Sequence, residues 1–351
     1  MSASRPVIMF ANPQHDEGLR KLLRETPLRG GMAVTLEREP LFFFEKMETV
    51  IAMLDNAVVA CGSRVSRPVN WDGRAVESSY LSDLRVHPSY QKYSGSILRD
   101  CYQLLSDSAK QRPSAVTWTA VFESNLAAVK TLGRRRRAIP EYVDRGGLRS
   151  PMLWCSPACR WPSHPGCRRA TEADRLELAA FLKRQFSNKT LAPVIVADDL
   201  PMGDFILIRE DDVLVAAMAV SDLREIKQIR AVELPWNLRI LRTAMKLLSP
   251  IFPLPILPAS GDLMALGYAS FLAVENDDAS LTHTLLRAAR VMAAEKGLSF
   301  LCACFHEDDP SFLGSKGLPA TRADGRLFQV MLSGNSDPWT DQIPHIEAAW
   351  L

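Results

Sequence analysis

The sequence predicts an α/β protein with mixed sheets, in which strands and helices alternate through two successive halves. Its 351 residues, 47% hydrophobic and 23% charged, suffice for two ordinary globular domains. Short apolar runs typical of strands alternate with longer runs at helical spacing. The halves also share a repeat, because apolar residues recur at a constant offset of 188 residues. The matching pairs are Tyr80 and Tyr268, Leu84 and Leu272, Val86 and Val274, Ile97 and Leu285, and Leu98 and Leu286.

The first half begins with a predicted strand and helix and continues with a hairpin. Asp55-Asn56 is the expected turn of that hairpin, and Pro88 closes the long extended run that follows it. The predicted elements, in order, are a strand at 7–10, a helix at 16–26, strands at 50–54, 57–65 and 76–86, a helix at 97–105, a strand at 115–122 and a short helix at 125–132.

The second half repeats this order. Thr171 is placed to cap a helix that runs to about Gln185, and Gly297 ends the last long helix. The other predicted elements are a hairpin of strands at 205–209 and 213–220, a helical insertion at 238–248, a strand at 264–275, a helix at 279–296 and a single strand at 298–305.

A loop rich in Pro, Cys and Trp separates the halves. It predicts an N-terminal domain at 1–153, an interdomain loop at 154–169 and a C-terminal domain at 170–351. Charge divides the chain similarly: residues 1–170 hold 25 of the 42 Lys and Arg and 16 of the 40 Asp and Glu, a balance of +9, against −7 for the remainder. The basic half is the one expected to attract a polyanion.

The composition excludes several classes of protein. The sequence has neither an uninterrupted apolar run of membrane-spanning length nor a secretory leader pattern, so we expect a cytoplasmic protein without a membrane partner. Seven cysteines, an odd number scattered in apolar strings, favour a reducing compartment over a disulfide framework.

The motif with the clearest chemistry follows the extended run at 76–86. Leu84-Arg85-Val86-His87-Pro88 leads into Gln91-Lys92-Tyr93-Ser94-Gly95-Ser96 and then into a helix. Small residues at a helix start let the backbone approach a phosphate, and the free amides and helix dipole hold a pyrophosphate without a metal. We therefore expect a phosphate-binding turn at Gln91–Ser96.

This segment resembles motif A of the GNAT superfamily of N-acetyltransferases, in which Leu-x-Val-x-Pro precedes Gln/Arg-x-x-Gly-x-Gly/Ala. Gln91, Ser94 and Ser96 occupy the three defined positions, with serine in place of the first glycine. Downstream, Asn125 and Ala128 match motif B, whereas Leu132 stands where many members carry a tyrosine that protonates the leaving thiolate. The resemblance implies two tandem GNAT-like domains, the second one degenerate. It also implies acetyl-CoA as cofactor and a primary amine, on a small molecule or a peptide, as acceptor. The residues expected to hold the cofactor are Leu84, Arg85, Val86, Gln91, Lys92, Tyr93, Ser94, Gly95, Ser96, Asn125 and Ala128.

Acyl transfer also needs an oxyanion donor and a base for the amine proton. Backbone amides near Leu84–Val86 are candidate donors, Glu77 and Asp83 are candidate bases, and Tyr80 or Tyr90 is a candidate acid. Spacing does not choose among them, and each also fits an ordinary structural role.

The second copy departs from the motif. Its counterpart of the phosphate turn, residues 275–284, has no glycine and contains the carboxylates Glu275, Asp277 and Asp278, which repel a pyrophosphate. We expect this half to have lost the cofactor site.

Two other features suggest rival functions. Cys155, Cys159, His164 and Cys167 lie within 13 residues, as in a small zinc knuckle, but prolines interrupt them and an ordinary loop is the main expectation, with no catalytic metal. Arg134–Arg137 form a basic run without any accompanying nucleic-acid-binding motif, so nucleic acid is the weakest hypothesis. The main alternative is a non-catalytic protein that binds CoA or another phosphorylated metabolite on the same scaffold.

Overall fold

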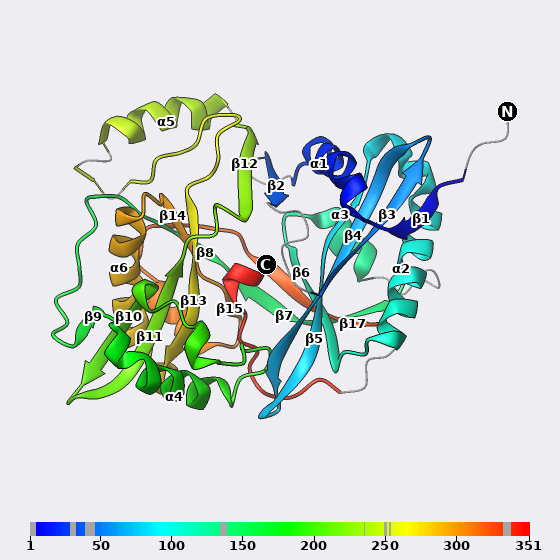
Figure 1. Cartoon of the computed structure of the whole chain (residues 1–351). Helices are drawn as coiled ribbons and strands as arrows, with labels where there is room; N and C mark the ends of the chain where they lie inside the picture. Colours follow the sequence, from blue (N-terminus) through cyan, green and yellow to red (C-terminus); the bar gives the residue numbers. More distant parts are fainter. Residues whose placement is uncertain are drawn as a thin grey trace.

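The structure is a computed structural model that describes residues 5–28, 33–38, 46–133, 139–234, 236–248, 251–252, 254–332 and 338–351. Arg134–Arg137 therefore lie outside the described residues. Two large mixed sheets stand next to one another and helices cover their outer faces (Figure 1).

The first sheet has eight described strands. In spatial order they are β1 (Val7–Phe10), β3 (Met47–Leu54), β4 (Ala57–Trp71), β5 (Arg74–Val86), β6 (Val116–Phe122), β17 (Gly325–Met331), β7 (Glu141–Arg149) and β15 (Phe305–His306).

The second sheet has seven described strands. In spatial order they are β16 (Ala320–Arg322), β8 (Pro151–Trp154), β14 (Phe300–Cys302), β13 (Leu266–Val274), β11 (Val213–Ser221), β10 (Phe205–Glu210) and β9 (Cys167–Arg169). A two-stranded sheet of β2 (Ala33–Arg38) and β12 (Lys227–Glu233) joins the two halves of the chain.

Six α-helices lie in the described part of the chain. They are α1 (Asp16–Glu25), α2 (Ser94–Gln111), α3 (Leu126–Leu132), α4 (Arg175–Phe186), α5 (Trp236–Leu248) and α6 (Ala279–Glu295).

The two long helices pack because their apolar residues recur at helical spacing. In α2, Ile97, Cys101 and Leu105 are buried against Val50 and Ala52 of β3. The helix α6 packs in the same way on the second sheet, at the opposite side of the molecule (Figure 1). Each sheet therefore carries the helix that the sequence places after its long strand.

The tight hairpin turns have carboxylate and amide side chains at the positions that demand positive φ. Asp55 and Asn56 have φ of 48° and 63°, and Asp211 and Asp212 have the same two values. Asn and Asp tolerate this conformation better than most residues. The predicted turn at Asp55-Asn56 and the predicted hairpin of β10 and β11 are both confirmed.

The two halves exchange strands. β17 comes from the end of the chain but lies between β6 and β7 in the first sheet, and β8 pairs with β14 in the second. The domain boundaries at 153/154 and 169/170 stay a prediction, since strands from both sides of them enter both sheets.

The expectation of one strand at 298–305 is wrong. Phe300–Cys302 forms β14 in the second sheet, and Phe305–His306 forms β15 in the first. The apolar run is continuous because both ends of it are buried, although the backbone crosses from one sheet to the other at Ala303 and Cys304.

A hydrophobic core lies between the halves and is shared by them. Tyr80 and Trp118 reach it from the first sheet, Tyr268 and Phe300 from the second, and Ile346 from the final segment. Residues that the repeat pairs, such as Tyr80 and Tyr268, thus meet in one core. The two halves therefore contact each other through residues that the repeat pairs.

Candidate active site

The strand that carries the first motif is interrupted by a β-bulge. The β4–β5 register pairs Cys61 with Arg85 and then Ser63 with Ser82, so Asp83 and Leu84 together stand opposite Gly62. Asp83 has φ of 56°. A bulge of this kind bends the strand and takes backbone groups out of the regular ladder. It lies just before the predicted phosphate turn.

β5 and β6 separate just before the bulge. Their parallel pairing runs only from Ser78 with Val116 to Tyr80 with Trp118. The next link is a side-chain contact, in which Thr119 Oγ1 donates to the carbonyl of Leu81 at 2.7 Å. The strand ends therefore diverge, and β5 continues towards the start of α2.

The turn itself begins as a short 3₁₀-helix, Pro88–Tyr93, that runs directly into α2. Gln91 Nε2 donates to the carbonyl of Val86 at 3.4 Å, and Ser96 Oγ donates to that of Tyr93 at 3.0 Å. The first contact joins the turn to the end of β5, and the second joins the start of α2 to the 3₁₀-helix before it.

The N-terminus of α2 is suited to an anion. No side chain caps it and no carboxylate lies in its first turn. A Cβ placed on Gly95 would meet no atom within 4 Å, so the backbone there is open to a ligand. Lys92 adds a positive charge beside it. Uncapped amides at a helix start are a favourable environment for phosphate.

The second copy has the same geometry at the same offset. β13 pairs with β14 from Leu266 with Phe300 to Tyr268 with Cys302, and residues 266 and 268 lie 188 positions after Ser78 and Tyr80. The β11–β13 register shifts between Ala217 and Ala219. Phe271, 188 positions after Asp83, has φ of 52°. The bulge and the diverging strands are therefore duplicated.

Known structures with this arrangement cover nearly the whole chain. A GCN5-related N-acetyltransferase from Sphaerobacter thermophilus superposes with a TM-score of 0.60 at 11% identity, covering 97% of this chain and 100% of that one. N-myristoyltransferase from Saccharomyces cerevisiae with bound myristoyl-CoA gives 0.57 at 11% identity, covering 98% and 89%. The chain has the GNAT acyltransferase fold. No protein-family model and no curated protein matches the sequence.

Within this GNAT fold, only one of the four candidate catalytic side chains lies at the bulge, and Tyr90 packs partly buried beside the core under α2. Asp83 is in it, half-buried, and accepts a hydrogen bond from Ser82 Oγ at 3.1 Å. Glu77 lies six residues earlier, about 20 Å along an extended strand, and its carboxylate pairs with Lys46 Nζ at 3.2 Å. Tyr80 is 5% exposed, and its ring centroid lies 4.6 Å from that of Trp118 in the shared core.

The motif B residues cap a helix. Asn125 Oδ1 accepts from the amide of Ala128 at 3.1 Å, which starts α3. The Asn125 side chain, which the GNAT resemblance places among the cofactor-holding residues, contacts the neighbouring backbone in the structure. Leu132, at the position of the motif B tyrosine, is 8% exposed and belongs to the buried apolar residues.

The end of α1 docks on the motif strand, a contact that no sequence pattern indicates. Arg85, 8% exposed, donates from Nη1 to the carbonyl of Thr26, and His87 Nε2 lies 3.4 Å from a carboxylate oxygen of Glu25. These contacts hold the side chains of Arg85 and His87 against the C-terminal end of α1.

In the second copy the corresponding positions are occupied by the chain's own side chains. Phe271 N, at the bulge, donates to Glu347 Oε2 at 2.9 Å, and Glu347 is 3% exposed. The amides of Ser280 and Leu281, at the start of α6, donate to Asp278 Oδ1 at 2.6 and 3.1 Å.

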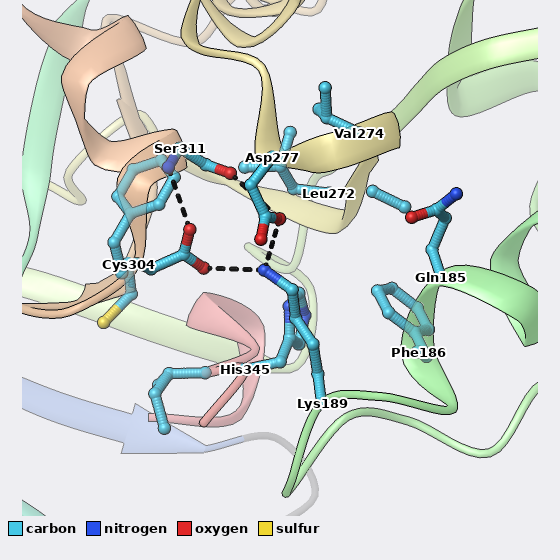
Figure 2. A pocket seen from close by; sticks show the side chains of 13 residues that line it. Gln185, Phe186, Lys189, Leu272, Val274, Asp277, Cys304, Ser311 and His345 are labelled. Carbon is cyan, nitrogen blue, oxygen red and sulfur yellow. Dashed lines mark hydrogen bonds and ion pairs between the residues drawn. The ribbon is translucent and has the colours of Figure 1, made fainter. Parts of the chain in front are cut away.

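A cation also fills the second cleft. Lys189 Nζ lies 2.6 Å from Asp277 Oδ1 and 3.1 Å from Asp309 Oδ2, and Ser311 N donates to Asp309 Oδ1. Figure 2 shows Lys189 reaching between these carboxylates, with Phe186 and His345 beside it. Lys189, Asp309 and Glu347 come from segments that carry no recognisable motif, so sequence reasoning missed them.

The cysteines of the interdomain loop do not gather with His164. Cys155 and Cys167 are buried in the core of the second half, and His164 Nδ1 accepts from the amide of Gly166 at 3.2 Å. Burial raises the pKa of the Cys167 thiol to about 11, which disfavours the thiolate that zinc needs. Among the described residues, no group of three or more such ligands could hold a metal ion.

Proposed function

We propose that this protein is an acyl-CoA-dependent N-acyltransferase whose first copy binds the CoA thioester, with acetyl-CoA as donor and a primary amine as acceptor. One contrast carries the proposal. The first turn of α2 has neither a side-chain cap nor a carboxylate, whereas Asp278 caps the equivalent turn of α6. Only the first of the two equivalent helix starts therefore suits a pyrophosphate.

Each part of the motif then has a task. The amides of Gly95 and Ser96 and the charge of Lys92 hold the pyrophosphate, and the diverging ends of β5 and β6 receive the extended arm. The bulge at Asp83-Leu84 directs backbone N–H groups at the thioester carbonyl. The second copy supports this task, because the equivalent amide of Phe271 donates to a carboxylate oxygen.

The reaction forms the amide C–N bond and breaks the thioester C–S bond. For the amine proton we assign Asp83, because of the two candidate carboxylates it alone lies at the bulge. A side-chain acid at position 132 is missing, since leucine is buried there. Protonation of the leaving thiolate is therefore left to solvent.

The charge asymmetry of the chain fits the two reactants. The half that carries the phosphate turn has a balance of +9 and the other has −7. Polyanionic CoA is attracted to the first and a protonated amine to the second. The acceptor class is thus a cationic amine, on a small molecule or a peptide.

A substitution at the turn tests the cofactor assignment. Ser94→Asp adds a negative charge beside the bound pyrophosphate and should weaken CoA binding on the order of tenfold or more. Because a carboxylate at a helix N-terminus stabilises the helix, the melting temperature should hold or rise.

The matched control is Ser94→Asn, which has nearly the same shape without the charge and should bind CoA much more tightly than Ser94→Asp. Calorimetric titration and thermal melts of the three proteins measure both effects. Equal affinity of the Asp and Asn variants would remove the phosphate from this turn.

The second candidate is a non-catalytic CoA-binding protein, favoured by the buried Leu132. Release of free thiol from acetyl-CoA in the presence of a panel of amines separates the two. Amine-dependent release that is lost in Asp83→Asn supports the enzyme. CoA binding without release for any amine supports the binding protein.

A further inference from the structure

The helix α5 exposes most of its apolar side chains to solvent. Trp236 is 75% exposed, Ile240 66% and Leu247 74%. Of the helix residues whose side chains are described, Met245 alone is buried. In Figure 1, α5 lies along the outer edge of the second half, apart from the other helices. A helix normally buries its apolar face, so this one lacks its usual partner in the described structure.

The three most exposed of the described apolar side chains of α5 form one stripe, and Leu241 and Leu248, 47% and 43% exposed, flank it about 100° farther around the helix. At about 100° per residue, Trp236, Ile240 and Leu247 fall within about 40° of one another around the helix. The stripe continues past the end of the helix, where Ile251 is 73% exposed and Phe252 51%. Its length and its aromatic ends are typical of surfaces that enter an apolar phase.

The charges of α5 have one sign. Arg239, Arg242 and Lys246 lie beside the apolar stripe, and the helix contains no Asp or Glu. Two of these side chains are also anchored: Arg239 Nε donates to the carbonyl of Leu234 and Arg242 Nε to that of Leu257, both at 3.0 Å. The anchors fix the orientation of the stripe relative to the rest of the chain.

We propose that α5 docks this protein on the surface of a bilayer that contains anionic lipids. An apolar stripe bordered by cations is the pattern of helices that lie in the headgroup region, where the apolar side chains enter the acyl boundary and the cations meet phosphates. A tryptophan at the edge of the stripe suits the same interface. The binding is peripheral: no helix in the described part of the chain has the length and apolarity needed to cross a membrane.

A second copy of this chain fits the same surface poorly. In a two-fold dimer the same patch meets itself, so the three cations of one helix would face those of the other, and α5 itself contributes no carboxylate. Asp262 Oδ2 lies 4.0 Å from Arg242 Nη2 and offsets one of these charges only in part. Anionic headgroups provide the complementary charge. The proposal departs from the sequence-based expectation of no membrane partner, which considered only spanning segments.

Sedimentation of the full chain with lipid vesicles tests the proposal. We expect binding to vesicles of phosphatidylcholine and phosphatidylglycerol, weaker binding to phosphatidylcholine alone, and a decrease with added salt. The triple variant Trp236→Ser/Ile240→Ser/Leu247→Ser should reduce partitioning at least about tenfold. Leu176→Ser is the matched control, because Leu176 is 78% exposed on α4; it should bind like the unchanged protein.

A second readout does not depend on the folding of the triple variant. Brominated lipids should quench a component of the fluorescence that is present in the unchanged protein and missing in Trp236→Phe. Equal partitioning of the triple variant and the unchanged protein overturns the proposal. Absence of binding to anionic vesicles also overturns the proposal. This holds both if sedimentation equilibrium shows a monomer and if it shows a dimer that the triple variant dissociates.

Discussion

Asp83 in the first copy and Phe271 in the second are equivalent positions with the same unusual backbone conformation. Both have positive φ, 56° and 52°, although neither is glycine and Phe271 is bulky. Bulky residues rarely adopt this conformation unless the surroundings impose it. The bulge that imposes it turns an amide out of the ladder, and in the second copy that amide binds Glu347. In the second copy this local backbone binds a side chain, and we propose that in the first copy it serves the thioester.

Glu347 tests this interpretation. Replacing Glu347 with Ala leaves the Phe271 amide without its acceptor, so we expect a loss of about 1–3 kcal/mol in the free energy of unfolding. Glu347→Gln keeps an acceptor oxygen and should lose less. Urea denaturation of both variants provides the comparison. Equal stability of the Ala and Gln variants would contradict a role as acceptor.

Asp174 gives a pH-dependent prediction. Hydrogen bonds from Arg168 hold the pKa of this buried carboxyl well below its usual range, despite its burial, and Thr171 also donates to it. Because the folded pKa is depressed, the stabilisation is present above the unfolded pKa of about 3.9 and is lost as the pH falls through the folded pKa.

Asp174→Asn should therefore lower stability by about 1–3 kcal/mol at pH 7, and by progressively less as the pH falls below about 4. Thermal melts at pH 3, 4, 5 and 7 measure this. A destabilisation independent of pH would contradict the assignment.

At the scale of elements, the decisive difference lies between the starts of α2 and α6. The strand, bulge and diverging partner are duplicated, but α6 is capped by Asp278 and the cleft beside it holds Lys189 with Asp277 and Asp309. These side chains cap the helix start and pair with one another's charges. We propose that they close the second copy to a cofactor.

Replacing Lys189 with Met tests whether the neighbouring carboxylates depend on its positive charge. Lys189 is 16% and Asp309 7% exposed, so removing the cation leaves a nearly buried carboxylate uncompensated, and we expect a loss of about 2–4 kcal/mol. Lys183→Met, on the exposed face of α4, is the control and should change stability by less than about 0.5 kcal/mol. Denaturation curves compare them. Similar curves for both variants would show that the carboxylates do not need Lys189.

Much of the arrangement of strands, helices and turns was predictable from the sequence. The 188-residue offset placed both long strands and both helices, and Asp55-Asn56 marked a hairpin turn. The carboxylates at 275–278 also signalled a changed helix start. Lys189 and Glu347 were not predictable, because they reach the cleft from the loop after α4 and from the final segment. Their pairing depends on tertiary packing, which has no local periodicity.

At the scale of the whole molecule, the exchange of strands makes the halves interdependent. β17 contributes Leu327, Phe328 and Val330, all at most 2% exposed, between β6 and β7 of the first sheet. The strand run at 298–305 was predicted as one element because both of its parts are equally apolar. A sequence pattern records burial but does not say which sheet buries each strand.

We therefore predict that residues 1–153 alone do not fold cooperatively, although they include the whole motif. Without β17, the facing edges of β6 and β7 lose their partner and the shared core loses the second sheet. Circular dichroism during heating tests this, with the full chain as control. A cooperative transition together with CoA binding by this fragment would contradict it.

Calorimetric titration of the full chain with acetyl-CoA, with desulfo-CoA and ATP as controls, tests most directly whether the first copy alone binds the cofactor. If the first copy binds the cofactor and the second is closed by its own side chains, one site per chain is expected, with much weaker binding of ATP. Two sites per chain would contradict the closure of the second copy. Absence of binding would contradict the assignment of a CoA site to the turn at Gln91–Ser96.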